Sequence, residues 1–177
     1  MTNKELKAIE ERLKLQNYQV IERGLACVAP KDLLILIDGK SRKIADTAAT
    51  LLDRQKEMEL LIKALITDSI RTAPGRIRAT NVLNWHGRAV PQAVEAHLHL
   101  LGDRSDDVLS NALFGIVFMR RRDLLPKLRK YLEEARPDSA RHKLFREAIG
   151  ALEADRPSLF SPGFHDANNV WRLNEQA

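Results

Sequence analysis

Apolar residues recur in this chain at a step of 31 to 33 residues, and that step constrains the fold more than any other feature. Equivalent positions of three successive segments are separated by 32 and then by 31 residues. A second series, Leu60, Ala93 and Leu124, has steps of 33 and 31. The aligned positions of the first series are Ala45, Ile77 and Val108; Ala48, Thr80 and Asn111; and Leu51, Leu83 and Phe114. Such a period predicts repeated pairs of helices, because one pair alone cannot cover its own apolar face.

Within the segments, apolar residues are spaced as on one face of a helix. The run KDLLILIDGK at 31–40 fits a strand or a short helix, and we expect a helix because no second strand-like run exists to pair with it. The stretch 68–75 contains Pro74 and Gly75 and is expected to be a loop. The expected helices cover 4–29 with an interruption near Asn17, then 41–53, 58–67, 76–86, 91–101, 106–122, 123–135 and 140–154.

A helix, a short turn and a second helix at this period, with little but apolar positions in common, resemble the HEAT-like alpha-alpha repeat family over about residues 16–155. Tetratricopeptide and ankyrin repeats have similar lengths, but their characteristic residues are missing. The resemblance implies an all-α fold, a short right-handed α-solenoid of antiparallel helical hairpins with about three clear repeats and degenerate ends. An irregular helical bundle is the alternative.

One helical-repeat domain is expected over 1–156, followed by an irregular C-terminal tail, 157–177, that packs on it through its aromatic residues. The single cysteine, Cys27, indicates a reducing compartment, and its small apolar neighbours predict a buried thiol. The N-terminus mixes charges of both signs, unlike a secretory signal, and the apolar run 33–37 is too short to span a membrane. We therefore expect a cytoplasmic protein without a membrane partner.

Residues with catalytic or metal-binding potential do not form a recognisable centre. His97 and His99 lie two apart, so on a helix their side chains point about 200° from each other and cannot bind one ion. No glycine-rich phosphate loop and no nucleophile turn is present. We expect no enzyme, no metal and no cofactor.

Positive charge gathers where acidic residues are missing. The chain carries 29 Lys and Arg against 24 Asp and Glu, yet no acid occurs from Ser69 to Val94. Equivalent edges of stacked hairpins lie side by side, so the arginines there and in the next hairpin could form one basic strip. The alternative is that Arg120, Arg121 and Arg122 only cap a helix end and the rest is solvated. The predicted partner-binding residues are Arg71, Arg76, Arg78, Trp85, His86, Arg88, Arg120, Arg121 and Arg122.

Two partners fit such a strip. An acidic protein surface would meet the arginines, with Trp85 as a buried anchor. Nucleic acid is the alternative; HEAT-like DNA glycosylases bind it, but their acidic residue beside aromatic side chains has no counterpart here, and aromatics are only 5% of the chain. In size and fold style the chain resembles bacterial immunity or accessory proteins encoded beside toxins. That resemblance implies a non-enzymatic protein that binds another protein and inhibits or scaffolds it.

Overall fold

The computed structural model describes residues 2–86 and 90–156, and all regular structure in this part of the chain is helical. The predicted all-α class is confirmed there. The chain divides into two compact units, Met1–Ala112 (unit 1) and Leu113–Ala177 (unit 2). None of the described helices combines the length and the apolar character needed to cross a bilayer. Arg88 and the tail 157–177 lie outside the described residues.

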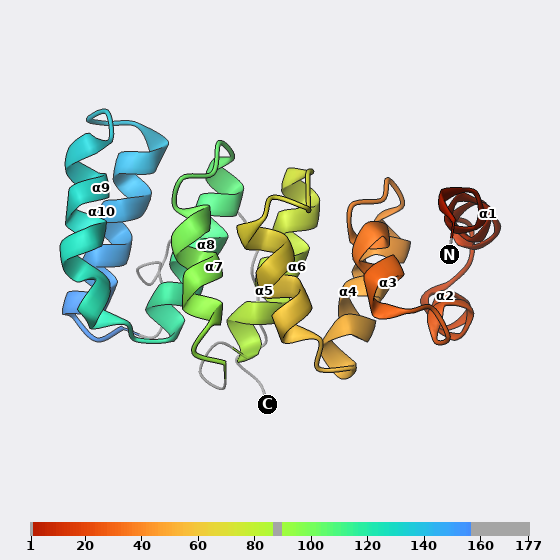
Figure 1. The fold of residues 1–177 in the computed structure, drawn as a ribbon. Helices are drawn as coiled ribbons and strands as arrows, with labels where there is room; N and C mark the ends of the chain where they lie inside the picture. The colour runs from red at the N-terminus through yellow and green to blue at the C-terminus, as the bar shows by residue number, and fades with distance from the viewer. Residues whose placement is uncertain (1, 87–89, 157–177) are drawn as a thin grey trace. The chain divides into compact units, whose positions relative to one another are not determined.

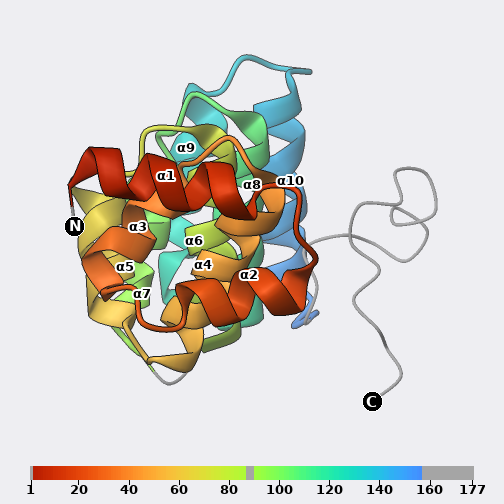
Figure 2. The ribbon, with the colours of Figure 1, turned by 90° about the vertical axis from the view of Figure 1, so that its right-hand side faces the viewer.

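Unit 1 is built from helices that pack on their neighbours and on alternate helices. Helix α4 packs against α2, α3 and α6, while α5 packs against α6 and α7. Figure 1 shows these helices, and Figure 2 shows α1 and α2 side by side. The helices are α1 (Asn3–Leu13), α2 (Tyr18–Leu25), α3 (Pro30–Ile37), α4 (Arg42–Arg54), α5 (Met58–Ile66), α6 (Ala73–His86), α7 (Ala93–Leu100) and α8 (Asp106–Phe118), of which α8 ends in unit 2.

The core of unit 1 contains most of the residues that the repeat aligns; Ile77 is only partly buried, and Phe114 lies in unit 2. The ambiguous apolar run is a helix, α3, whose Leu33 and Ile37 are fully buried. Two of the aligned positions, Thr80 and Asn111, are polar yet buried. The other aligned positions that are buried are Ala45, Ala48, Leu51, Leu83 and Val108. Seven of the nine aligned positions are therefore buried.

Helix starts in this chain are fixed by side chains that accept backbone hydrogen bonds. Thr2 and Glu5 form a capping box at α1, and Asn17 accepts the Val20 N–H at the start of α2. Asn17 is the interruption expected from the sequence. Pro30 stands in the first turn of α3, where its missing N–H leaves no bond unmade. Each cap satisfies a donor that the helix itself leaves free.

Four helix ends share one turn geometry without glycine. After α4, α5, α8 and α10, a residue with positive φ is followed by a backbone bond that runs back five positions. For α4 the Lys56 N–H donates to the Asp53 carbonyl and the Glu57 N–H to the Leu52 carbonyl. This is the Schellman pattern, in which glycine is usual at the position with positive φ. The residues at that position are Lys56 (φ 59°), Asp68 (53°), Arg120 (54°) and Asp155 (56°).

Unit 2 holds a short 3₁₀ turn, Arg122–Leu124, followed by α9 (Leu125–Glu134) and α10 (Ala140–Glu153). Helices α9 and α10 pack against each other, and the rings of Tyr131 and Phe145 stack between them at 5.4 Å. Ser139 caps α10 by accepting the His142 N–H at 3.1 Å. Aromatic stacking thus adds to the apolar contact of this hairpin.

Three sequence expectations are wrong in detail. Helix α6 begins at Ala73, so Pro74 and Gly75 lie inside its first turn, where proline is tolerated. Helix α8 ends at Phe118, because Arg120 takes the left-handed conformation; the helix does not reach the three arginines. Cys27 is exposed, because it follows the end of α2 in a turn where its neighbour Val28 is the buried residue.

We predict that Lys56→Gly stabilises the protein by about 0.5–1 kcal/mol, because glycine removes the cost of positive φ at an exposed position. The matched control is Lys63→Gly in the middle of α5, which should destabilise by about 1 kcal/mol. Urea unfolding followed by circular dichroism measures both. Equal destabilisation by the two variants would contradict the role assigned to Lys56.

Candidate functional site

One edge of unit 1 is organised by Asp38, the residue that ends α3. Its carboxylate accepts the backbone N–H groups of Arg71 (2.7 Å) and Thr72 (3.0 Å) and the Thr72 hydroxyl (2.7 Å). The Thr72 hydroxyl oxygen in turn accepts the Gly75 N–H at 3.1 Å. Asp38 therefore fixes the start of α6, a helix that begins 35 residues later in the chain. A carboxylate at this end of a helix also favours the helix dipole.

Gly75 allows this close approach. A Cβ atom at Gly75 would lie 2.2 Å from Asp38 Oδ1 and 2.8 Å from Ile70 Cγ2, well inside van der Waals contact. Any side chain there would push Asp38 away from the helix start. Glycine is therefore required at position 75, because no room is left there for a side chain.

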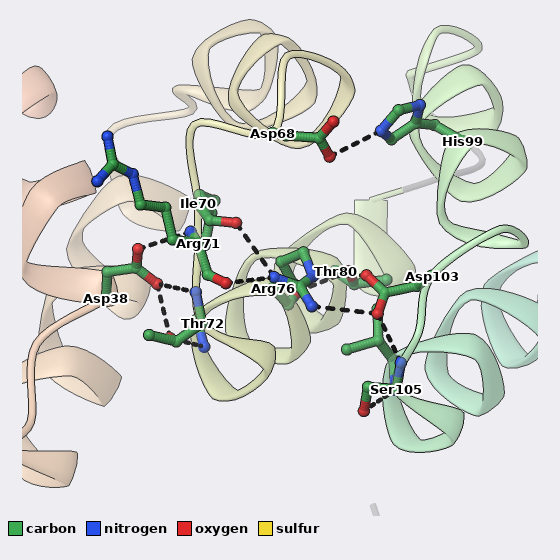
Figure 3. Close-up of polar contacts among 12 residues, drawn as sticks. Asp38, Asp68, Ile70, Arg71, Thr72, Arg76, Thr80, His99, Asp103 and Ser105 are labelled. Carbon is green, nitrogen blue, oxygen red and sulfur yellow. Dashed lines mark hydrogen bonds and ion pairs between the residues drawn. The ribbon is translucent and has the colours of Figure 1, made fainter.

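Arg76 joins the same loop to the start of α8. Its Nε and Nη2 donate to the two carboxylate oxygens of Asp103 at 2.6 and 3.1 Å. Its Nη1 donates to the carbonyls of Arg71 (2.6 Å) and Ile70 (3.4 Å). Asp103 also accepts the Ser105 N–H at 2.8 Å, one residue before α8. Figure 3 shows this arrangement, in which the two side chains are only 15% and 8% exposed.

An open pocket of about 620 Å³ lies beside this ion pair. His99, near the end of α7, faces Asp68 across it, and His99 Nε2 lies 3.0 Å from Asp68 Oδ1 (Figure 3). Ile70 and Leu100, both buried, belong to its wall. The remaining lining residues are Arg71, Arg76, Gly102, Asp103 and Arg104.

The charges of this pocket are of two kinds. Arg76 and Asp103 neutralise each other in a nearly buried pair. Arg71 and Arg104 are exposed, and neither side chain forms an ion pair with a described residue. Figure 3 shows the Arg71 guanidinium pointing away from Arg76 and Asp103, on the side where Asp38 lies. Three arginines against two aspartates leave one net positive charge while His99 is neutral.

A buried polar cluster lies elsewhere in unit 1, where α6, α7 and α8 meet. The Asn84 amide donates to the backbone carbonyl (3.2 Å) and to Oδ1 (3.3 Å) of Asn111. The Asn111 amide donates to the Ile77 carbonyl at 3.1 Å. His97 Nε2 lies 2.6 Å from Asn84 Oδ1, and His97 Nδ1 lies 2.5 Å from the Ala93 carbonyl oxygen; the neutral ring has one N–H and donates to one of these two oxygens. These bonds satisfy buried polar groups and fix the register of the three helices.

His97 and His99 therefore face opposite ways, as their spacing predicts. His97 is fully buried, and burial lowers its pKa to about 4, although the hydrogen bond to the Ala93 carbonyl opposes that lowering. His99 is partly exposed at the pocket. Across the described residues, no group of three or more His, Cys, Asp and Glu side chains is placed to hold a metal ion.

The predicted partner-binding residues of unit 1 do not all meet at one place. Arg71 and Arg76 belong to the pocket, whereas Arg78 donates to Asp46 (2.6 Å) and to the Ile37 carbonyl (3.3 Å). Trp85 is 57% exposed but lies nine residues after Arg76, about 14 Å farther along α6. His86 ends that helix.

The three predicted arginines of unit 2 are engaged with neighbouring groups of that unit. Arg121 donates two bonds to Asp123, at 2.7 and 2.6 Å, and these hydrogen bonds hold the pKa of Asp123 below its usual value. Arg120 and Arg122 pair with Asp155 at 3.5 and 3.4 Å. Arg122 also donates to the Leu152 carbonyl in the last turn of α10. The single basic strip that would join both units stays a prediction.

His99, Asp103 and Arg104 were not among the residues selected from the sequence. A signal existed for Asp103 alone, because Asp38, Asp68 and Asp103 each follow the apolar end of a helix. An acid repeated at that point indicates a carboxylate that binds the loop or helix start of a neighbouring hairpin. The pocket lies among these loops.

We predict that Gly75→Ala destabilises the protein by about 1–3 kcal/mol, since the new methyl group would displace Asp38 from the start of α6. Gly102→Ala is the control, because its Cβ would meet nothing nearer than the His99 carbonyl at 3.7 Å. Its effect should stay within about 0.5 kcal/mol. Thermal or urea unfolding compares the two, and a Gly75→Ala variant as stable as the control would contradict the close approach.

His97 predicts a specific loss of stability in acid. Above its ordinary pKa of 6.5 the ring is neutral in both the folded and the unfolded chain. Between pH 6.5 and about 4 only the unfolded chain binds the proton, so the free energy of unfolding falls as the pH falls; below about 4 this contribution is constant. The loss sums to about 3 kcal/mol. Urea unfolding between pH 6.5 and 4 should show this fall in the free energy of unfolding for the natural chain and not for His97→Gln. Equal pH dependence of the two proteins would contradict the role assigned to His97.

Comparison with known proteins adds no family to this geometry. No protein-family model matches the chain, and neither a curated protein nor a solved structure matches it. The resemblance to HEAT-like repeat proteins therefore stays a prediction from the spacing of apolar residues. Function must be inferred from the surface that these helices present.

Proposed function

We propose that this chain is a non-enzymatic helical-repeat protein of the HEAT-like kind, a short α-solenoid that binds an acidic segment of another protein. Binding inhibits the partner or holds it in an assembly, as immunity proteins do when they neutralise a toxin. The interaction takes place in the cytoplasm. The pocket of unit 1 is the binding site, with Arg71 and Arg104 as its recognition residues. Fold alone does not assign such a role, so the proposal stands on the site.

One observation supports it above the others. Arg71 and Arg104 are exposed beside a pocket of about 620 Å³ and form no ion pair with a described residue, while the pocket's inner charges are already paired. A guanidinium is the preferred group for carboxylate recognition, because its planar donors match both oxygens. The pair Arg76–Asp103 holds the two loops that carry these residues. Because these loops are already held in place, little backbone conformational entropy is lost when the arginines bind a ligand.

Nucleic acid is the weaker candidate. Five of the predicted arginines bind carboxylates of the chain itself, namely Arg76, Arg78, Arg120, Arg121 and Arg122. Phosphate binding would require more free cations along one face, since each neutralised phosphate contributes separately to affinity. The residues that line the described pocket include no Phe, Tyr or Trp on which a base could stack.

A tetramethylrhodamine-labelled octa-aspartate peptide is the probe for the proposal, with fluorescence anisotropy as the measurement. We expect binding at low salt that weakens about tenfold in Arg71→Ala/Arg104→Ala, because two exposed charge contacts are lost. The control, Arg136→Ala/Arg146→Ala, removes the same charge from two exposed arginines of unit 2 and should bind as the natural chain does.

Two results would overturn the proposal. Equal weakening by both double variants would show that net charge alone attracts the peptide. Tighter binding of a short DNA duplex than of the peptide, with a steep loss as salt rises, would favour the nucleic-acid function instead. Circular dichroism of each variant establishes that the helical fold is intact.

A further inference from the structure

One guanidinium, that of Arg76, contacts both loops that carry the exposed arginines of the pocket. Its Nη1 donates to the Arg71 carbonyl at 2.6 Å, and its Nε and Nη2 donate to the carboxylate of Asp103 at 2.6 and 3.1 Å. Asp103 directly precedes Arg104 in the chain. The Arg76 side chain is only 15% exposed, and most of its donors are used by the chain itself. It is therefore suited to hold the loops rather than to bind a ligand.

The turn that contains Arg104 is joined to Arg76 through a single oxygen atom. Asp103 Oδ1 accepts from Arg76 Nη2 and also from the Ser105 N–H, which lies 2.8 Å away. Arg104 is the residue between Asp103 and Ser105. A continuous set of hydrogen bonds therefore links the backbone of Arg71, through Arg76, to the turn on which Arg104 is carried.

The two exposed arginines are carried on different sides of this bridge. Figure 3 shows the Arg71 guanidinium on the side of Asp38. Asp103 lies on the opposite side of Arg76 in the same view. A ligand that contacts both exposed arginines therefore needs two separate acidic groups. When two contacts form on a rigid frame, the strength of the second depends on how well the spacing of the ligand's groups matches that of the frame.

We infer that Arg76 is a positioning residue that sets the separation of Arg71 and Arg104, so that the pocket selects an acidic segment with two carboxylates at one preferred spacing. The inference rests on the proposed function of the same site and names its ligand more narrowly. Lysine would keep the charge of Arg76 but not the planar set of donors that reaches Asp103 and the loop carbonyl together. The separation therefore depends on the guanidinium and not on the charge alone.

Peptides with two aspartates separated by zero to four prolines test the spacing, with both peptide ends capped to remove their charges. Prolines form a semi-rigid spacer of about 3 Å per residue. In NMR chemical-shift titrations at low salt, the natural chain should bind one spacing most tightly. Replacing one aspartate of that peptide by asparagine should weaken binding about two- to fivefold, the loss of one exposed charge contact. Arg71→Ala should show no preference among the spacings.

Arg76→Lys should bind the peptides without a preferred spacing. Arg78→Lys is the matched control, because Arg78 is in the same helix, is also 15% exposed and donates to Asp46 and to a backbone carbonyl, but does not line the pocket. It should keep the natural preference, which a merely structural role of Arg76 would not predict. Asp103→Asn weakens the same bridge with a side chain of equal size and should also lose the preference. Circular dichroism establishes that each variant is folded.

The outcomes separate the inference from the proposed function. Octa-aspartate binding that depends on Arg71 and Arg104, without a preferred spacing in the natural chain, would overturn the inference and leave the function standing. A preference that persists in Arg76→Lys and Asp103→Asn, or that is lost equally in Arg78→Lys, would overturn the inference as well. Failure of the octa-aspartate peptide to bind would overturn both.

Discussion

Hydrogen bonds from loop backbones to aspartates hold the polar edge of unit 1 in place. Asp38 fixes the start of α6, and Asp103, together with Arg76, fixes the approach to α8. Arg76 and Asp103 are nearly buried, so removal of either partner would leave a charge without compensation, which is costly. Arg76 also donates to two loop carbonyls, those of Ile70 and Arg71. The pocket and its exposed arginines exist because these loops are held.

The charges of the sequence acquire a different meaning once the chain is folded. Residues 69–94 include no Asp or Glu. Two arginines of this interval nevertheless pair with aspartates outside it, Arg76 with Asp103 and Arg78 with Asp46. A stretch of sequence without acidic residues therefore does not by itself predict a positively charged surface. What remains is the smaller set of cations that form no ion pair with a described residue, and two of them, Arg71 and Arg104, line one pocket.

Most of the fold could be predicted because helices depend on local pattern. The 32- and 31-residue steps located inward-facing positions such as Ala48 and Leu83, and the lack of a pairing strand identified α3 as a helix. The errors fell where tertiary contacts or turn geometry decide, as at the glycine beside Asp38 and at the left-handed Arg120. The site was predicted only in part. Arg71 came from composition, whereas His99 and Arg104 lie together with it only because separate loops meet.

Two histidines two positions apart lie on opposite faces of α7, one buried and one exposed. His97 points inward, where its bond to Asn84 joins α7 to α6 and burial keeps the ring neutral. His99 points outward and lies 3.0 Å from Asp68 in the open pocket. Protonation of the buried ring opposes folding, because the folded chain holds the pKa of His97 at about 4 and the unfolded chain binds the proton at higher pH.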